Sequence, residues 1–275
     1  MLDRELVEAV RLAREAGRIL LEIYAGAELA VDYKGVDDPV TEADRRVNAF
    51  IVGRLRESFP ADAIVAEETA QQVGSRTGGR IWYVDPLDGT KEFIAKNGEF
   101  SVMIGLAVDG EAQLGVVYQP TADILYRGVV GDGAFWEQRD KTWGLKVSDV
   151  NDPSRLRLVV SRSHRPPATD ALKGALGITE EITSGSVGLK VGLIASRRAD
   201  LYVHVSDRTS AWDACAPDAI LRAAGGVFCD LTGRSMEYAG AEVRNKRGLV
   251  ACNRKSWERV QPVVEQIARD AGLAG

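Results

Sequence analysis

Two stretches near the start of the chain have the spacing of amphipathic helices. From Asp3 to Tyr24 and from Glu42 to Phe59, apolar residues recur every three or four positions, with charged residues between them. Such spacing places the apolar side chains on one face of a helix, where they can pack against a core. The pattern therefore predicts two core-facing helices ahead of a first strand near Ile64.

The middle of the chain consists of short runs of β-forming residues. Ile81 to Val84 is the first clear run, and the segments SVMIGLAV, QLGVVYQP, ILYRGVV and AFWEQ follow it. Asp109-Gly110 separates the first two of these segments, and Gly131-Asp132-Gly133 separates the last two. Asp-Gly between such runs is a strong hairpin signal. We therefore expect an antiparallel meander covered by helices in about residues 1–149.

Strands and helices alternate in the rest of the chain. A polar stretch at residues 149–154, ending in Asp152-Pro153, marks the change. The expected order is strand Leu156 to Ser161, a helix, a short strand, helix Val187 to Ala195, strand Asp200 to Val205, a helix beginning at Trp212-Asp213, then a strand and turn. This alternation indicates a layered α/β arrangement. We therefore expect one domain over residues 1–275 with two lobes, about 1–149 and about 150–275.

Composition and charge exclude some classes of protein. The chain has 275 residues, of which 45% are hydrophobic and 27% are charged, and its formal net charge is −5. These fractions are ordinary for a globular protein. A negative balance without a clustered basic face argues against a nucleic-acid partner, and no apolar run is long enough to cross a membrane. The scattered cysteines and the absence of a signal peptide predict a cytoplasmic protein.

The segment IWYVDPLDGTKEF, from Ile81 to Phe93, carries the clearest indication of chemistry. Pro86 keeps Asp85 extended, and Gly89 permits a backbone conformation that side chains disfavour. We expect a sharp bend that turns Asp85 and Asp88 inward together. Two carboxylates held this close repel unless they share a proton or bind a cation, and hard oxygen ligands suit Mg²⁺. Taken alone, the segment fits an ordinary Asp-Gly turn equally well.

Other acidic residues stand at the ends of predicted elements. In the segment DPVTEAD, Thr41 or Asp44 lies near the start of the second helix, and Glu67 and Glu68 follow the run AIVA. In WDACAPDAILRAAGG, we expect Asp213 as the helix N-cap, Pro217 in the first turn and Gly225-Gly226 as the stop. Each of these residues has a structural explanation of its own, but together they form a pattern.

The order TEAD, EE, DPLDGT and a late WD resembles the lithium-sensitive, magnesium-dependent phosphomonoesterases: inositol monophosphatases, fructose-1,6-bisphosphatases and bisphosphate nucleotidases. The resemblance runs from about Leu6 to Asn253. Within this group, Lys91-Glu92-Phe93, SRSH ending at His164, GSVGLK ending at Lys190 and CAPDAILRAAGG are similar to the 3′(2′),5′-bisphosphate nucleotidases. The resemblance implies an αβαβα sandwich with the site between its lobes, and conversion of adenosine 3′,5′-bisphosphate to AMP.

The resemblance also implies roles for matching residues. The ligands of two or three Mg²⁺ ions would be Glu67, Asp85, the Leu87 carbonyl, Asp88 and Asp213. Asp44, Thr90 and Glu67 would be catalytic, with the Thr90 hydroxyl passing a proton from water to Asp44. The amides of Gly89 and Thr90, beside Asp88, would hold the phosphate. Lys190 would neutralise a second phosphate, to which Ser186 or His164 would donate.

Two alternatives remain open at this point. An inositol monophosphatase or a broad-specificity sugar or polyol phosphatase would share every metal ligand, and only Lys91-Glu92 and the Lys190 region argue against it. A non-catalytic nucleotide or metal sensor on the same scaffold would not need Thr90 and the full set of acids. Lys190 itself equally fits a solvated helix position. For each enzyme hypothesis the partner is a phosphorylated small molecule, and the chain is a monomer or homodimer.

Overall fold

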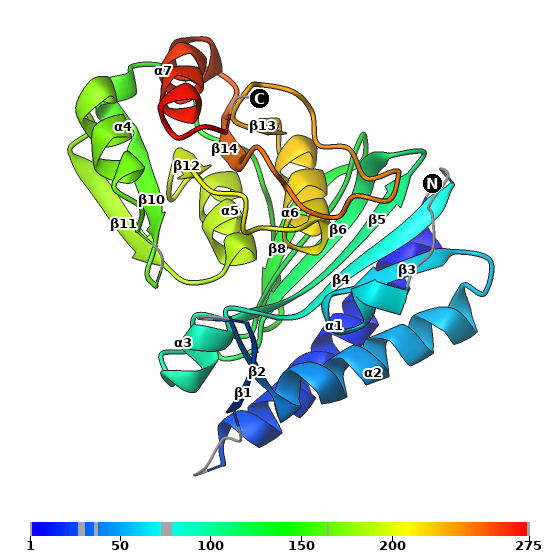
Figure 1. The fold of residues 1–275 in the computed structure, drawn as a ribbon. Coiled ribbons are helices and arrows are strands. Elements are labelled where there is room, and N and C mark those ends of the chain that lie inside the picture. Colours follow the sequence, from blue (N-terminus) through cyan, green and yellow to red (C-terminus); the bar gives the residue numbers. More distant parts are fainter. Residues whose placement is uncertain (1, 27–30, 36–37, 73–78, 164, 274–275) are drawn as a thin grey trace.

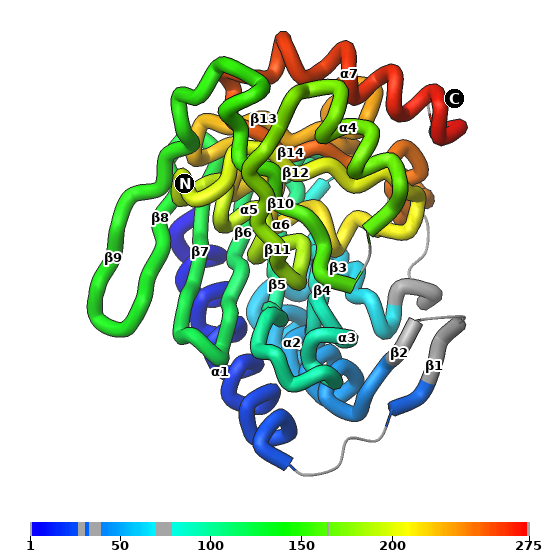
Figure 2. Tube along the Cα trace, turned by 90° about the vertical axis from the view of Figure 1, so that its left-hand side faces the viewer, coloured from blue at the N-terminus to red at the C-terminus, as the bar shows by residue number. Residues whose placement is uncertain are grey.

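A computed structural model describes residues 2–26, 31–35, 38–72, 79–163 and 165–273. Its helices and sheets form five layers (Figure 1). The layers are, in order, helices α1 (Asp3–Tyr24) and α2 (Glu42–Ser58), a seven-stranded sheet, helices α5 (Val187–Ala195) and α6 (Ala211–Ala223), a five-stranded sheet, and helices α4 (Ala168–Leu176) and α7 (Trp257–Asp270). The expected αβαβα sandwich is confirmed. In Figure 2, α4 and α7 lie at the end of the molecule opposite α1 and α2.

The seven-stranded sheet follows the order of the chain. Its strands are β3 (Ala63–Ala66), β4 (Arg80–Asp88), β5 (Ser101–Val108), β6 (Glu111–Gln119), β7 (Ile124–Val129), β8 (Gly133–Gln138) and β9 (Lys141–Gly144). β3 is parallel to β4, and every later pair is antiparallel, so the expected meander is confirmed. The short edge strand β9 was not expected from its sequence, KTWG, and all its residues are exposed.

Strand β4 differs from its expected length. It continues past Val84 to Asp88, and its register against β5 shifts between Asp85 and Asp88. The expected bend is therefore an irregularity inside the strand, of the kind that an extra residue in one strand produces. Pro86 fits at this position because the extra residues do not take part in the regular ladder.

The five-stranded sheet is mixed. Its order is β11 (Glu180–Ser184), β10 (Arg157–Ser161), β12 (Leu201–His204), β14 (Leu249–Asn253) and β13 (Gly226–Cys229). β10 is parallel to both neighbours, and β14 is antiparallel to both of its neighbours. The smaller elements are the hairpin of β1 (Val31–Gly35) and β2 (Asp38–Thr41), helix α3 (Thr90–Ile94), and the 3₁₀ turns η1 (Glu67–Gln72) and η2 (Pro153–Arg155).

Three groups of buried side chains fill the spaces between the layers. Leu12, Ile51 and Trp82 belong to the group between α1, α2 and the seven-stranded sheet. A second group surrounds α5 and α6, and a third lies beneath α4 and α7. The seven-stranded sheet is thus covered on both faces, which explains why β5 is apolar without alternation from Val102 to Val108.

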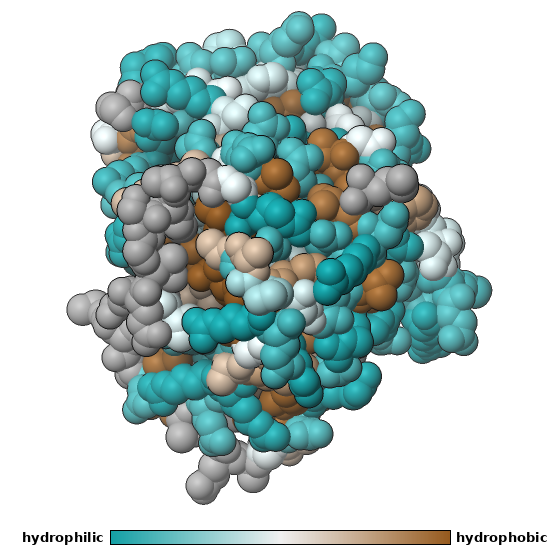
Figure 3. Space-filling view, turned by 90° about the vertical axis from the view of Figure 1, so that its right-hand side faces the viewer, coloured by the Kyte–Doolittle hydropathy of each residue, from teal (hydrophilic) through white to brown (hydrophobic). Residues whose placement is uncertain are grey.

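The surface of the described residues is mainly polar. In Figure 3, polar residues cover most of the visible face, and apolar residues appear as patches between them. The exposed large apolar side chains among the described residues are Val7 and Trp143. None of the helices in the described part of the chain is long and apolar enough to span a bilayer.

Helix α6 packs on the seven-stranded sheet over a row of glycines. Gly105, Gly115 and Gly128 are register partners on β5, β6 and β7. A Cβ atom at Gly115 would lie 2.1 Å from the carbonyl oxygen of Ala216, and one at Gly105 would lie 2.7 Å from the Ala216 nitrogen. The helix backbone therefore approaches the sheet more closely than residues with a side chain would allow.

We expect Gly115→Ala to lower the free energy of unfolding by about 1–3 kcal/mol, because the added atom meets helix backbone that cannot move aside. Urea unfolding would measure the change. Gly144→Ala is a matched control on the edge strand β9, where an added Cβ meets nothing within 4 Å. Equal stability of the two variants would contradict the close packing of α6.

Candidate active site

Three carboxylates converge where β4 and α6 meet. Asp85, Asp88 and Asp213 have ligand oxygens within 4.8 Å of one another. Alternation along β4 places Asp85 on the same face as Tyr83, which belongs to the core group around α6. The register shift that follows brings Asp88 beside it, as the bend in the sequence predicts. Asp213 comes from the first turn of α6.

Each of the three carboxylates has an oxygen held by a hydrogen bond. Asp85 Oδ1 accepts from the Leu87 amide at 3.0 Å. Asp88 Oδ2 accepts from the Ser186 hydroxyl and, at 2.9 Å, from the Gly188 amide. Asp213 Oδ2 accepts from the Ser210 amide at 2.6 Å. These bonds fix the orientation of the carboxylates, and with it the direction in which their remaining oxygens face.

The start of α6 differs from the sequence prediction. The N-cap is Ser210, and Asp213 occupies the third helical position, where the two residues form a capping box. The prediction overlooked the serine three residues before Asp213. Pro217 lies inside the helix, beyond its first turn, where it cannot donate to the carbonyl of Asp213. The predicted stop is confirmed, because Gly225, with φ of +84°, follows the C-cap.

The carboxylate cluster is crowded with negative charge. Burial raises the pKa of Asp85 well above its usual range, and the charges of Glu67, Asp88 and Asp213 raise it further. Burial also raises the pKa of Asp88, against the opposing effects of Lys190 and the Ser186 hydroxyl. Among the described residues, the charge of Lys190 alone does not balance these acids. A hard divalent cation fits a donor set made of carboxylate oxygens.

Glu67 and Leu87 lie beside this cluster. Glu67 is the first residue of η1, directly after β3, and its charge acts on Asp85. Among the described residues, the group within the 4.8 Å limit does not include Glu67. The Leu87 carbonyl oxygen lies 3.3 Å from the Thr90 hydroxyl oxygen. Glu67 is therefore placed next to the three-aspartate group, and Leu87 lies between Asp85 and Asp88 on β4.

The structure places Thr90 against Asp44. The Thr90 hydroxyl donates to Asp44 Oδ1 at 3.1 Å. Asp44 Oδ2 accepts from the hydroxyl and the amide of Thr41, at 2.6 and 2.7 Å, and so caps helix α2. The two oxygens of Asp44 thus serve two purposes. The expected contact between Thr90 and Asp44 is present, and it leaves the helix cap intact.

Gly89 lets the chain turn from β4 into α3. Its φ is +101°, in the left-handed region, and it is the N-cap of the helix that begins at Thr90. A Cβ atom at this position would also lie 3.1 Å from the carbonyl oxygen of Glu99. A residue with a side chain is disfavoured here on both grounds.

Lys190 is buried, so the solvated-surface interpretation is wrong. Its exposed fraction is 3%, and its Nζ lies 5.0 Å from the centroid of the Tyr202 ring. Burial lowers the pKa of Lys190 to about 8, against the opposing charges of Asp88 and Glu92. The helix that carries it lies between two sheets and has hardly any polar face. Ser186, the N-cap of the same helix, directs its hydroxyl at Asp88, and His164 lies outside the described residues.

Sequence reasoning missed a set of long-range contacts around Glu92 and Glu99. Glu92 is buried and accepts a hydrogen bond from the Ser163 hydroxyl. Glu99 accepts two hydrogen bonds from Arg162, at 2.7 and 2.6 Å, and one from the Gly185 amide at 2.6 Å. These contacts join α3 and the segment after it to the residues that follow β10 and to the start of α5. Nothing local in the sequence pairs these residues.

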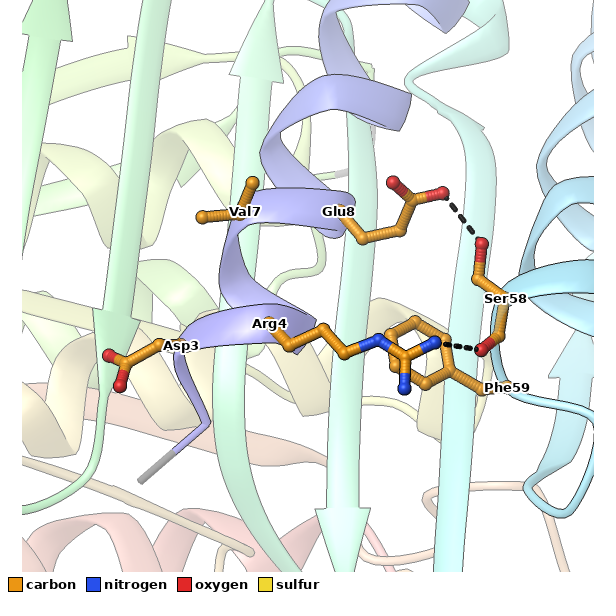
Figure 4. A pocket seen from close by; sticks show the side chains of 6 residues that line it. All are labelled: Asp3, Arg4, Val7, Glu8, Ser58 and Phe59. Carbon is orange, nitrogen blue, oxygen red and sulfur yellow. Dashed lines mark hydrogen bonds between the residues drawn. The ribbon is translucent and has the colours of Figure 1, made fainter.

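A cavity of 360 Å³ lies elsewhere, at the start of α1 and the end of α2 (Figure 4). There the Arg4 guanidinium donates to the Ser58 carbonyl at 2.8 Å and lies over the Phe59 ring, while the Ser58 hydroxyl donates to Glu8. Its lining holds two acids, one base and apolar groups, and no convergent set of carboxylates. These contacts tie α1 to α2, and the acid cluster remains the candidate active site.

The chain is similar to known proteins over most of its length. The model of the inositol monophosphatase family matches residues 1–269. The chain is 37% identical over 240 residues to the 3′(2′),5′-bisphosphate nucleotidase CysQ of Salmonella typhimurium, covering 86% of this chain and 95% of that protein. The IMPase of Thermotoga maritima superposes with a TM-score of 0.81 at 26% identity, covering 98% of this chain and 100% of that one.

The chain therefore belongs to the inositol monophosphatase family. Within the family, it is similar to proteins named as bisphosphate nucleotidases. The crystal structure of CysQ from Bacteroides thetaiotaomicron superposes with a TM-score of 0.76 at 30% identity, covering 91% of this chain and 97% of that one.

Proposed function

We propose that this protein is an Mg²⁺-dependent phosphomonoesterase that hydrolyses the 3′-phosphate of adenosine 3′,5′-bisphosphate, giving AMP and phosphate. The observation that carries the proposal is the convergence of Asp85, Asp88 and Asp213 beside the Thr90–Asp44 hydrogen bond. The similarity to CysQ proteins over 86% of the chain favours a nucleotide bisphosphate as substrate.

The proposed ligands of two or three Mg²⁺ ions are Glu67, Asp85, the Leu87 carbonyl, Asp88 and Asp213. The crowding of carboxylates supports this assignment, because burial and then the charges of Glu67, Asp88 and Asp213 raise the pKa of Asp85, and a bound cation would offset both effects. When bound, Mg²⁺ would neutralise charge on the phosphoryl oxygens and make the attacking water more acidic.

Thr90 and Asp44 form the proposed proton-transfer pair. The Thr90 hydroxyl would orient the attacking water and accept its proton while its own proton passes to Asp44 Oδ1, which lies 3.1 Å away. A threonine alone is a poor base, so the adjoining carboxylate is essential to this role. Glu67, whose charge acts on Asp85, would assist, and the amides of Gly89 and Thr90 would hold the phosphate oxygens.

Lys190 is the proposed partner of the second phosphate, with His164 as a further donor. A buried ammonium close to Asp88 and Glu92 provides a cation at the side of the site formed by α5. The hydroxyl of Ser186 is directed at Asp88, so we do not retain it as a donor to this phosphate.

Lys190→Met should lower kcat/KM for adenosine 3′,5′-bisphosphate by about 10–100-fold, the value of one charge-assisted hydrogen bond. The same variant should hydrolyse adenosine 3′-monophosphate nearly as well as the wild type, because that substrate lacks the second phosphate. Lys173→Met, on α4 in the outer layer, is the control. An equal loss with both substrates would remove Lys190 from this role.

The substrate class is tested by comparing kcat/KM for adenosine 3′,5′-bisphosphate and inositol 1-phosphate, with and without Mg²⁺. A preference for inositol 1-phosphate would overturn the nucleotide proposal in favour of an inositol monophosphatase. Phosphate release that does not depend on a divalent ion would overturn the metal site. A lack of phosphate release from every phosphomonoester tried would favour a sensor on this scaffold.

Three further proposals concern the whole protein. We propose two lobes, about residues 1–149 and 150–275, with the metal ligands mainly in the first and the second-phosphate contacts in the second. We propose cytoplasmic residence, for which the three free, buried cysteines are the support. We propose that its partners are small phosphorylated molecules, and that it acts as a monomer or homodimer.

A further inference from the structure

The start of α5 contains a serine with an unusual backbone conformation. Ser186 has φ of +54° and ψ of 133°, and it is only 4% exposed. Residues other than glycine rarely adopt such a conformation, which costs on the order of 1–3 kcal/mol. Glycines lie immediately before it and two residues after it, yet the strained position itself carries a hydroxyl. A glycine would fit this position without strain, so the serine hydroxyl must make contacts that offset the cost.

The bonding capacity of this hydroxyl is fully used. It donates to Asp88 Oδ2, accepts from the Leu189 amide at 3.1 Å, and lies 3.0 Å from the Ser101 hydroxyl. A serine hydroxyl has one proton and two acceptor positions. Because its proton is directed at Asp88, Ser101 must be the donor in their contact. No proton remains for a substrate phosphate unless the bond to Asp88 breaks.

Asp88 Oδ2 accepts a second hydrogen bond from α5. The Gly188 amide donates to Asp88 Oδ2 at 2.9 Å. A Cβ atom at Gly188 would lie 2.7 Å from both Met103 Sδ and Val117 Cγ1, so the glycine permits this approach of the helix to the sheet. Asp88, at the irregular end of β4, is therefore anchored by the N-cap and first turn of α5, and the N-cap Ser186 lies 98 residues later in the chain.

We propose that Ser186 is a positioning residue that orients the Asp88 carboxylate for metal binding, and that it is not a substrate ligand. This inference rests on the proposed function, because Asp88 is a proposed Mg²⁺ ligand. Groups that hydrogen-bond a ligating carboxylate fix its direction, and their loss typically costs 10–100-fold in metal affinity.

The first test is calorimetric titration of metal-stripped protein with Mg²⁺. Ser186→Ala removes the hydroxyl, and Ser186→Gly removes it while relieving the backbone strain. Both variants should bind Mg²⁺ about 10–100-fold more weakly than the wild type. Ser186→Gly should melt at or above the wild-type temperature without metal, which would exclude unfolding as the cause. Ser184→Ala is the control, because the Ser184 hydroxyl contacts only the Gly185 carbonyl among the described residues.

The second test is kinetic. With Ser186→Gly, the Mg²⁺ concentration for half-maximal activity should rise, while KM for adenosine 3′,5′-bisphosphate at saturating Mg²⁺ should stay near the wild-type value. A raised substrate KM with an unchanged Mg²⁺ requirement would overturn the proposal and restore Ser186 as a substrate ligand.

The two tests separate this inference from the function on which it rests. If the wild type releases phosphate from no substrate, the proposed function fails, while the titration still decides the role of Ser186. Equal Mg²⁺ affinity in the wild type and both variants would overturn that role even if the enzyme is a nucleotidase. A wild type that does not bind Mg²⁺ would overturn both.

Discussion

Asp85→Asn should abolish Mg²⁺-dependent phosphate release, lowering kcat by about 1,000-fold or more. A loss of that size corresponds to about 4 kcal/mol of transition-state stabilisation, within the several kcal/mol that a bound metal supplies. The amide is similar in size to the carboxylate and carries no charge, so it weakens the metal site without opening a cavity. Phosphate release at a series of Mg²⁺ concentrations would measure the loss.

The same variant should be at least as stable as the wild type when no metal is present. Burial and three neighbouring acids disfavour the charged form of Asp85, and the substitution removes that charge. Melting curves with and without Mg²⁺ should therefore show that Mg²⁺ stabilises the wild type more than the variant. Asp132→Asn, in the exposed turn between β7 and β8, is the matched control. Full activity of Asp85→Asn would refute the metal site.

Thr90→Ala should lower kcat by about 100–10,000-fold, the usual contribution of a general acid or base. Its effect on Mg²⁺ affinity and on substrate KM should be small, because the proposed role concerns the attacking water. Thr90→Ser keeps a hydroxyl within reach of Asp44 and should retain most of the activity. Single-turnover measurements at saturating Mg²⁺ would isolate the chemical step, and an unchanged rate in Thr90→Ala would remove the residue from the mechanism.

The parts of the fold that were predictable from sequence depend on local signals. Helix α1 was predicted at its observed bounds, because its amphipathic spacing extends over many turns. The hairpins at Asp109-Gly110 and Gly131–Gly133 follow from residues that permit a positive φ. Strands β1, β2 and β9 have no comparable local signal, and their positions depend on pairing with a neighbouring strand.

The residues of the site also fall into those with a local sequence signal and those without one. The acids of β4 and α6 were recognisable because each stands beside a proline, a glycine or a helix start in the sequence. The Ser186–Asp88 and Ser163–Glu92 contacts join residues 98 and 71 positions apart, so no sequence spacing could reveal them. The burial of Lys190 could have been predicted, because VGLKVGLIA holds a single polar residue and is apolar on every face.

The glycine row beneath α6 provides a criterion for recognising inactive relatives. The three glycines occupy one register line across β5, β6 and β7, and α6 then carries Asp213 toward the two aspartates of β4. A relative with a bulky residue on this line must hold its equivalent helix farther from the sheet. We expect its third carboxylate to lie too far from the other two for a shared ion. A chain that keeps every acid but loses a glycine of this line would thus be a candidate pseudoenzyme.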